Sequence, residues 1–143
     1  MLSDKISENI LATQNAAQSI LDILHKGLTM ENARVLADSI HTMNESLTKL
    51  ASLENEKAFP ILQNSPERSA KLCGERYARE ISRLSSKINA YAATYADAET
   101  IYAAQHNFPP VTDFLVEALL NHLDRQQNEF SPILEKADTH AIL

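Results

Sequence analysis

The fold of this chain is decided by residues 3–27, which read SDKISENILATQNAAQSILDILHKG. Apolar and small residues recur there in steps of three or four positions, at Ile6, Ile10, Thr13, Ala17, Ile20 and Leu24. This spacing places them on one face of a helix that packs lengthwise on its neighbours. A helix is therefore predicted over residues 3–27, with Ser3 as its N-cap and Gly27 just past its last residue.

The next segment, residues 30–62, has the same helical pattern and begins near Thr29. Glu31 lies in its first turn, where the helix dipole favours a negative charge. The inward stripe consists of Ala33, Leu36, Ile40, Met43, Leu47 and Leu50, followed by Glu54. We expect the helix to end or kink around Phe59-Pro60 because proline disrupts a helix interior.

Two more helices are predicted, over residues 66–106 and 111–138. Ser65-Pro66-Glu67 supplies a cap, a proline at the first helical position and an acid at the second. The stripe of the third helix is Ala70, Cys73, Tyr77, Ile81, Leu84, Ile88, Tyr91, Tyr95, Ala98 and Tyr102. The stripe of the fourth is Leu115, Leu119, His122, Gln126, Phe130 and Ile133. Pro132 falls where this helix should end or bend.

Short connections between the four segments make neighbouring helices antiparallel. The sequence therefore predicts an all-α fold, an up-down antiparallel four-helix bundle that forms a single domain over residues 1–143. Its 2 glycines are too few for a barrel or sandwich with many tight turns.

Composition narrows the classes of function. The chain has 13 basic and 19 acidic residues, and no long basic cluster, which argues against a general nucleic-acid or membrane surface but leaves room for a small local patch. The polar start of the chain and the absence of a long apolar run predict a cytoplasmic protein. The sequence contains no Gly-rich phosphate loop, nucleophile elbow or metalloprotease motif, so we expect no enzymatic activity.

Polar residues on two of the inward stripes predict a buried polar site near the bundle axis. Glu54 follows Leu50 by one helical turn, and Gln126 follows His122 in the same way. These spacings place Glu54, His122 and Gln126 at similar depth near the bundle axis. Carboxylates and imidazoles from facing helices form metal sites in bundles. Alternatively, His122 bonds Glu54 or a tyrosine in a satisfied polar cluster, or Glu54 reaches solvent.

The third predicted helix is longer than the first, and Tyr91, Tyr95 and Tyr102 lie in the excess. The excess length indicates either a bend in the helix or a protruding end that pairs with a second chain, and two interpretations of the tyrosines are open. The tyrosines form an interface with a second chain, since tyrosine suits a contact with one wet edge, or they cap the core of their own bundle.

An internal repeat with an offset of 72 residues relates the two halves of the chain. Pro60-Ile61-Leu62 in the first half matches Pro132-Ile133-Leu134 in the second. The segment HLDRQQNEFSPILE at residues 122–135 resembles the hemerythrin-like, HHE cation-binding signature, His-Leu-x-x-Glu-Glu-x-x-Leu-Phe-Pro-x-Leu-Glu. LASLENEKAFPIL at residues 50–62 resembles the same signature.

This resemblance implies a four-helix bundle with a di-iron centre, in a family associated with oxygen binding, oxygen or iron sensing, and repair of iron centres. Most of the implied ligands are missing. The family's His-x-x-x-Glu pair falls on Leu50 and Glu54 in the first half, and on His122 and Gln126 in the second. The histidine of the first helix falls near Thr13 or Gln14, and that of the third near Gly74 or Tyr77.

The predicted interior polar cluster, a possible vestige of the metal site, consists of Gln14, Glu54, Tyr77, His122 and Gln126. We expect no metal or other cofactor there, because the di-iron site has decayed. The first hypothesis is thus a regulatory or scaffolding protein that acts through its surface, as a homo-oligomer or with a protein partner.

Two alternatives remain open. A secretion or flagellar-type export chaperone would suit a small, acidic, helical chain, and the leucines at 47, 50 and 53 resemble the leucine-rich stretch of such chaperones. The other alternative is a reduced mononuclear site for iron or another single divalent metal, with Glu54 and His122 as its ligands and Tyr77 or Gln126 as a candidate third ligand.

Overall fold

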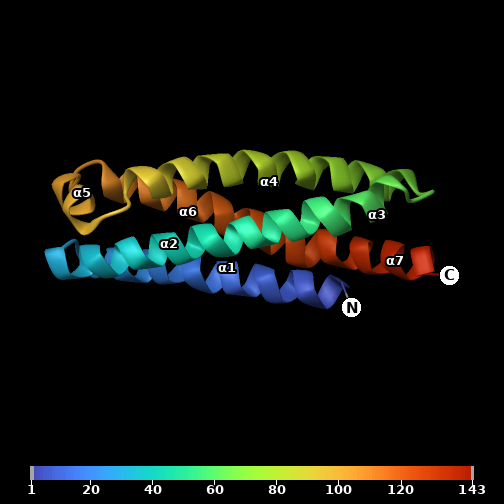
Figure 1. The fold of residues 1–143 in the computed structure, drawn as a ribbon, viewed down its shortest axis with the longest axis horizontal. Helices are drawn as coiled ribbons and strands as arrows, with labels where there is room; N and C mark the ends of the chain where they lie inside the picture. Colours follow the sequence, from blue (N-terminus) through green and yellow to red (C-terminus); the bar gives the residue numbers. More distant parts are fainter. Residues whose placement is uncertain (1, 143) are drawn as a thin grey trace.

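The computed structural model describes the backbone of residues 2–142 and the side chains of residues 2–139. Within that range the chain is all helical and has no strand, as predicted (Figure 1). No helix in the described part of the chain has the length and apolar character needed to span a membrane.

The elements follow one another with short connections. They are α1 (Leu2–His25), α2 (Met30–Leu53), the π-helical turn η1 (Glu54–Ala58), α3 (Phe59–Gln63), α4 (Arg68–Thr94), α5 (Ala98–Ala103), α6 (Phe108–Arg125), the π-helical turn η2 (Gln126–Phe130) and α7 (Ser131–Ile142). The chain remains helical from α2 through η1 into α3, and from α6 through η2 into α7.

The long segments lie side by side along the long axis of the molecule (Figure 1). α1 packs against α2 and α6, and α4 packs against α2 and α3. His25 contacts Asp113 near one end of α1, and Ser7 contacts Gln127 near the other, so α1 and α6 run in opposite directions.

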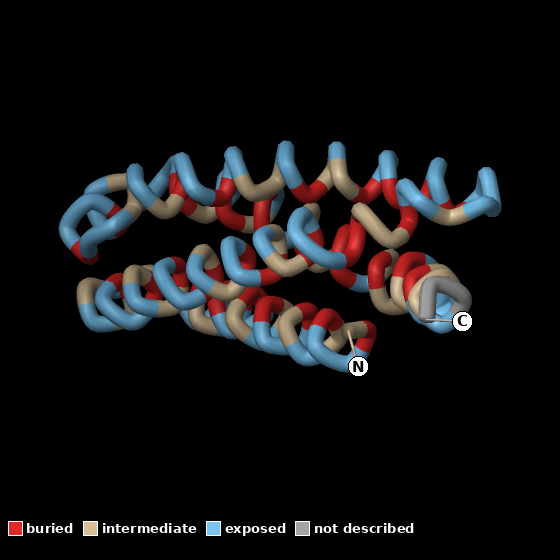
Figure 2. Tube along the Cα trace, turned by 45° about the vertical axis from the view of Figure 1, so that its right-hand side comes forward, coloured by how far each residue is buried: buried red, intermediate tan, exposed pale blue. Residues whose placement is uncertain are grey.

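The core lies along the inward faces of these helices (Figure 2). All six stripe residues of α1, the six apolar stripe residues of α2, and Glu54 are buried. Burial of a large aliphatic side chain stabilises the fold by about 1.5–3 kcal/mol, so these stripes supply the main driving force for folding. The predicted inward faces are therefore confirmed for the first two segments.

Helix ends agree with the sequence prediction in part. Thr29 is the N-cap of α2 and accepts a hydrogen bond from the Asn32 amide at 3.0 Å. Gly27 has a φ of 111°, a left-handed conformation that glycine adopts without strain. The predicted N-cap Ser3 instead lies within the first turn of α1. Ser65 accepts a hydrogen bond from the Glu67 amide and caps a turn that precedes α4, which begins at Arg68.

The helix predicted over residues 66–106 is divided into two helices in the structure. α4 ends at Thr94, and α5 begins at Ala98 after a short turn. Asp97 causes the restart, because its carboxylate accepts hydrogen bonds from the Thr100 amide and hydroxyl, both at 2.8 Å. α5 then packs against α2.

The last predicted helix begins earlier than residue 111. α6 starts at Phe108, with Pro109 and Pro110 in its first turn. Proline fits there because the first amides of a helix have no intrahelical partner. Phe108 is buried, which anchors this helix end in the core.

Both internal prolines follow a π-helical turn. The Phe59 amide donates to the Glu54 carbonyl, five residues back, and the Ser131 amide donates to the Gln126 carbonyl in the same way. A proline has no amide hydrogen and its ring needs space, and a widened turn provides that space. The chain therefore continues through Pro60 and Pro132 as a helix, and the two π-turns repeat at the 72-residue offset of the sequence repeat.

Candidate functional site

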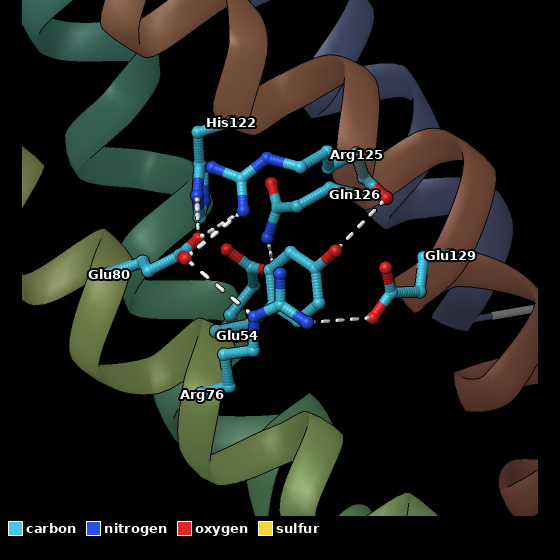
Figure 3. Close-up of polar contacts among 8 residues, drawn as sticks. Glu54, Arg76, Glu80, His122, Arg125, Gln126 and Glu129 are labelled. Atoms are coloured by element: carbon cyan, nitrogen blue, oxygen red, sulfur yellow. Dashed lines mark hydrogen bonds and ion pairs between the residues drawn. The ribbon is translucent and has the colours of Figure 1, made fainter.

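The two π-turns place a polar pair in the middle of the core. Glu54 and Gln126 are the first residues of η1 and η2, and both side chains are fully buried. The Gln126 Nε2 donates a hydrogen bond to the Glu54 Oε2 at 2.5 Å. Figure 3 shows the two side chains pointing toward each other from opposite halves of the chain. The sequence repeat thus brings its equivalent polar positions into direct contact.

His122 lies one helical turn before Gln126, and its side chain is also fully buried. Its Nδ1 lies 2.9 Å from the Glu80 Oε2 on α4. Arg125 donates to both oxygens of the same carboxylate, at 3.0 and 3.1 Å. The expectation that His122 bonds Glu54 or a tyrosine is therefore wrong. Its partner is Glu80, which connects the buried imidazole to the half-exposed Arg125 (Figure 3).

Sequence reasoning missed Glu80 because it stands beside Ile81 and off the apolar stripe of the third segment. A spacing argument assigns such a residue to solvent. Its role comes from the packing of α4 against the second half of the chain. We use the name core polar cluster for Glu54, Tyr77, Glu80, His122, Arg125 and Gln126.

Burial controls the charges in the core polar cluster. It raises the pKa of Glu54 to about 8, against the opposing effect of the Gln126 hydrogen bond, so this carboxyl is protonated at neutral pH. Burial also lowers the pKa of His122, against the opposing effect of Glu80. For Glu80, burial acts to raise the pKa, but hydrogen bonds from Arg125 and His122 outweigh it and the pKa is lowered. The ionised pair is thus Glu80 with Arg125, and the deeper groups are neutral.

Three buried atoms of the core polar cluster have no hydrogen-bond partner, namely Glu54 Oε1, His122 Nε2 and Gln126 Oε1. Because the Glu80 carboxylate accepts from His122, the proton of the neutral imidazole belongs on Nδ1, and Nε2 keeps a free lone pair. A protonated Glu54 has one hydroxyl hydrogen to donate. The core therefore contains unused donor and acceptor capacity next to a satisfied ion pair.

Tyr77 belongs to this site, and Gln14 does not join it. The Tyr77 hydroxyl donates to the Arg125 carbonyl at 3.2 Å, and its ring centroid lies 5.6 Å from that of His122. Gln14 is half-buried and forms no side-chain hydrogen bond with the described residues of the cluster. Thr13 is the buried residue at that level, and its hydroxyl donates to the Asn9 carbonyl.

The three tyrosines proposed for an interface have different surroundings. Tyr91 is buried, and its hydroxyl lies 2.7 Å from that of Thr112. Tyr95 packs edge-on against Phe108, with ring centroids 4.9 Å apart. These two tyrosines therefore complete the core of their own chain, whereas Tyr102 is 36% exposed.

Within the described residues, no three His, Cys, Asp or Glu side chains are grouped as metal ligands. Glu54 and His122 are the two such residues in the predicted vestigial site, and the third donor there is the amide of Gln126. Comparison of the chain with protein-family models, curated proteins and solved structures gives no match.

Proposed function

We propose that the chain is an up-down four-helix bundle of the hemerythrin-like type in which protein groups have replaced the di-iron centre. On this proposal it acts through contacts with proteins, as a regulatory or scaffolding component, and not as an enzyme. The proposal rests mainly on one observation, the hydrogen bond from Gln126 to Glu54. It joins the two positions that the resemblance equates with carboxylate ligands on the second and fourth helices.

The residues present do not fit two iron ions. One equivalent carboxylate is an amide, the other is neutral at pH 7, and Leu50 stands at a histidine position. Two cations in a buried site need anionic ligands to balance their charge. No reaction step through a di-iron centre is therefore assigned to this chain.

The surface of α6 supports the interaction part of the proposal. Phe114 is 74% exposed, and Val111, three positions earlier on the helix, is 43% exposed. Residues three apart lie on the same helix face, so both would be covered by one partner. Sedimentation velocity tests for a second copy. We expect a dimer that Phe114→Ser converts to monomer and that Leu72→Ser, a matched exposed position on α4, leaves intact. A monomeric native protein would refute self-association.

Thermal unfolding in the presence of Fe(II) or a chelator tests the loss of the metal site. A resident ion at 100 times its Kd stabilises a protein by about 2.7 kcal/mol, which raises the Tm of a domain this size by several degrees. We expect neither addition to change the Tm. A rise with Fe(II), or a fall with chelator, would refute the proposal.

A single divalent cation is the second candidate, favoured by the three partnerless atoms Glu54 Oε1, His122 Nε2 and Gln126 Oε1. One imidazole nitrogen, one carboxylate and one amide oxygen suit a single ion such as zinc or iron. This function predicts that Zn(II) raises the Tm of the wild-type protein at pH 8 and leaves that of His122→Ala unchanged. An equal response of both proteins would place any bound ion elsewhere.

A further inference from the structure

A groove on the outer face of α4 presents a row of basic side chains. Arg79, Arg83 and Lys87 follow one another at intervals of four residues and line a groove of about 710 Å³ between α4 and η1. Four residues advance a helix by about 6 Å, so the row is about 12 Å long. All three side chains are exposed on the same face of the helix.

The remaining lining consists almost entirely of further hydrogen-bond donors. Ser82 and Ser86 stand between the basic residues, and Asn55 faces them from η1. Ala78 is the one apolar residue among the described residues of the lining, although carbon atoms make up most of the groove's exposed surface. The groove thus combines guanidinium, ammonium, hydroxyl and amide groups and contains no carboxylate.

These basic groups have no partner within the described part of the chain. None of Arg79, Arg83 and Lys87 forms an ion pair or a side-chain hydrogen bond there. Arg76, on the same helix, contrasts with them because it pairs with Glu80 and Glu129. The chain has six more acidic than basic residues, so three adjacent unpaired cations are a local departure from its overall charge.

We propose that this groove binds a small ligand carrying two or more phosphate groups. Arg guanidinium groups bind phosphate oxygens through two parallel hydrogen bonds, and a lysine adds a point charge. Hydroxyl and amide donors complete the shell around the remaining oxygens. The long side chains of the row can converge on a compact ligand from both ends.

The composition of the groove favours this ligand over macromolecules. A protein partner is held mainly by large apolar and aromatic anchors in the interface core, and the described lining of this groove contains no large apolar or aromatic residue. A nucleic acid needs a longer basic surface, and a chain with a net charge of −6 repels an extended polyanion beyond a 12 Å row. A short polyphosphate needs no apolar anchor, and it is small enough to be bound by a basic row of this length.

Calorimetric titration of the full chain with sodium tripolyphosphate at low ionic strength tests the proposal. We expect one site per chain and weaker binding as salt increases. Arg83→Gln is expected to weaken binding about tenfold, which is about 1.4 kcal/mol. Arg83→Lys keeps the positive charge but loses the paired guanidinium hydrogen bonds, so it should weaken binding less than Arg83→Gln does. The double variant with Arg79→Gln and Arg83→Gln should abolish binding. Lys71→Gln, an exposed lysine of α4 outside the groove, is the matched control and should remain within about twofold of wild type.

Other probes identify the chemistry that the groove recognises. Citrate, a carboxylate anion that carries fewer charges than tripolyphosphate, is expected to bind at least about tenfold more weakly. Equal binding of citrate, or an equal loss in Lys71→Gln, would overturn the proposal in favour of general anion attraction. Tighter binding of a polyglutamate peptide or a single-stranded RNA would overturn it in favour of a macromolecular partner. Circular dichroism of each variant checks that its helical fold is intact, and wild-type affinity in a folded variant that carries both Arg79→Gln and Arg83→Gln also overturns the proposal.

Discussion

The substitution Glu54→Gln tests the state of the buried carboxyl. Burial raises its pKa from 4.5 to about 8. Between these two values the unfolded chain releases the proton and the folded chain keeps it, so the free energy of unfolding falls as pH rises. A shift of that size corresponds to about 5 kcal/mol over the whole interval, and the loss is complete above the folded-state pKa.

At lower pH, titration of His122 makes the free energy of unfolding rise with pH, which is opposite to the effect of Glu54. Its pKa is lowered from 6.5 by burial, so its contribution to stability grows as pH rises through 6.5, where the unfolded imidazole is still half protonated, and levels off about one pH unit higher. Only about 0.4 kcal/mol of this gain remains above pH 6.5, so Glu54 dominates the change in stability between pH 6.5 and 8. Over this pH interval we expect the free energy of unfolding of the wild-type protein to fall by about 2 kcal/mol, since one pH unit corresponds to about 1.36 kcal/mol per proton.

Glu54→Gln removes the titrating group and keeps its shape. The new amide can still accept from Gln126 Nε2, and it can donate to the partnerless Gln126 Oε1. We expect its free energy of unfolding to change by less than about 0.5 kcal/mol between pH 6.5 and 8, and to exceed that of the wild type by several kcal/mol at pH 8.

The assay is urea unfolding followed by circular dichroism at half-unit steps of pH. Glu56→Gln, an exposed residue of the same π-turn, is the matched control and should keep the slope of the wild type. An equal loss of stability between pH 6.5 and 8 in Glu54→Gln and in the wild type would contradict this prediction, because the titrating group would then lie elsewhere.

Four further predictions concern packing, hydrogen bonding and cooperativity. Gly74→Ala should cost about 1–3 kcal/mol in urea unfolding, because the new Cβ would lie 2.9 Å from the Leu62 Cβ. Tyr91→Phe should cost a similar amount, since it leaves the buried Thr112 hydroxyl without its partner. His122→Leu should change stability by less than about 1 kcal/mol, because it also removes a partnerless buried nitrogen; a loss of several kcal/mol would contradict this. Calorimetry should show one cooperative transition for this continuous core, whereas early, broad melting that sharpens on addition of a partner helix would favour an export chaperone.

Apolar periodicity was sufficient to predict most of the core. The stripe of the first segment is buried at every position, and Glu54, His122 and Gln126 are buried as their spacing required. In the last segment the pattern is displaced after η2, where Leu134 is buried in place of the predicted Ile133. The π-turn adds a residue to one turn and shifts the phase of the helix that follows.

The spacing of residues along the sequence could not predict the contacts between different helical segments. The partner of His122 is 42 residues away on α4, and nothing in the local sequence marks Glu80 as its partner. The break before α5 had a local signal, the Asp97 and Thr100 pair, but the continuing apolar pattern obscured it. Helical periodicity thus predicts which faces turn inward, whereas the pairing of polar groups depends on how the helices pack against one another.

The iron content of protein expressed in iron-supplemented medium, measured by elemental analysis together with an absorbance spectrum, tests the central claim most directly. We expect no stoichiometric iron and no oxo-bridge bands, because Gln126 and a neutral Glu54 stand at the positions that the proposed hemerythrin-like resemblance equates with carboxylate ligands. About two irons per chain with oxo-bridge absorption would contradict it and would restore a role in oxygen or iron chemistry.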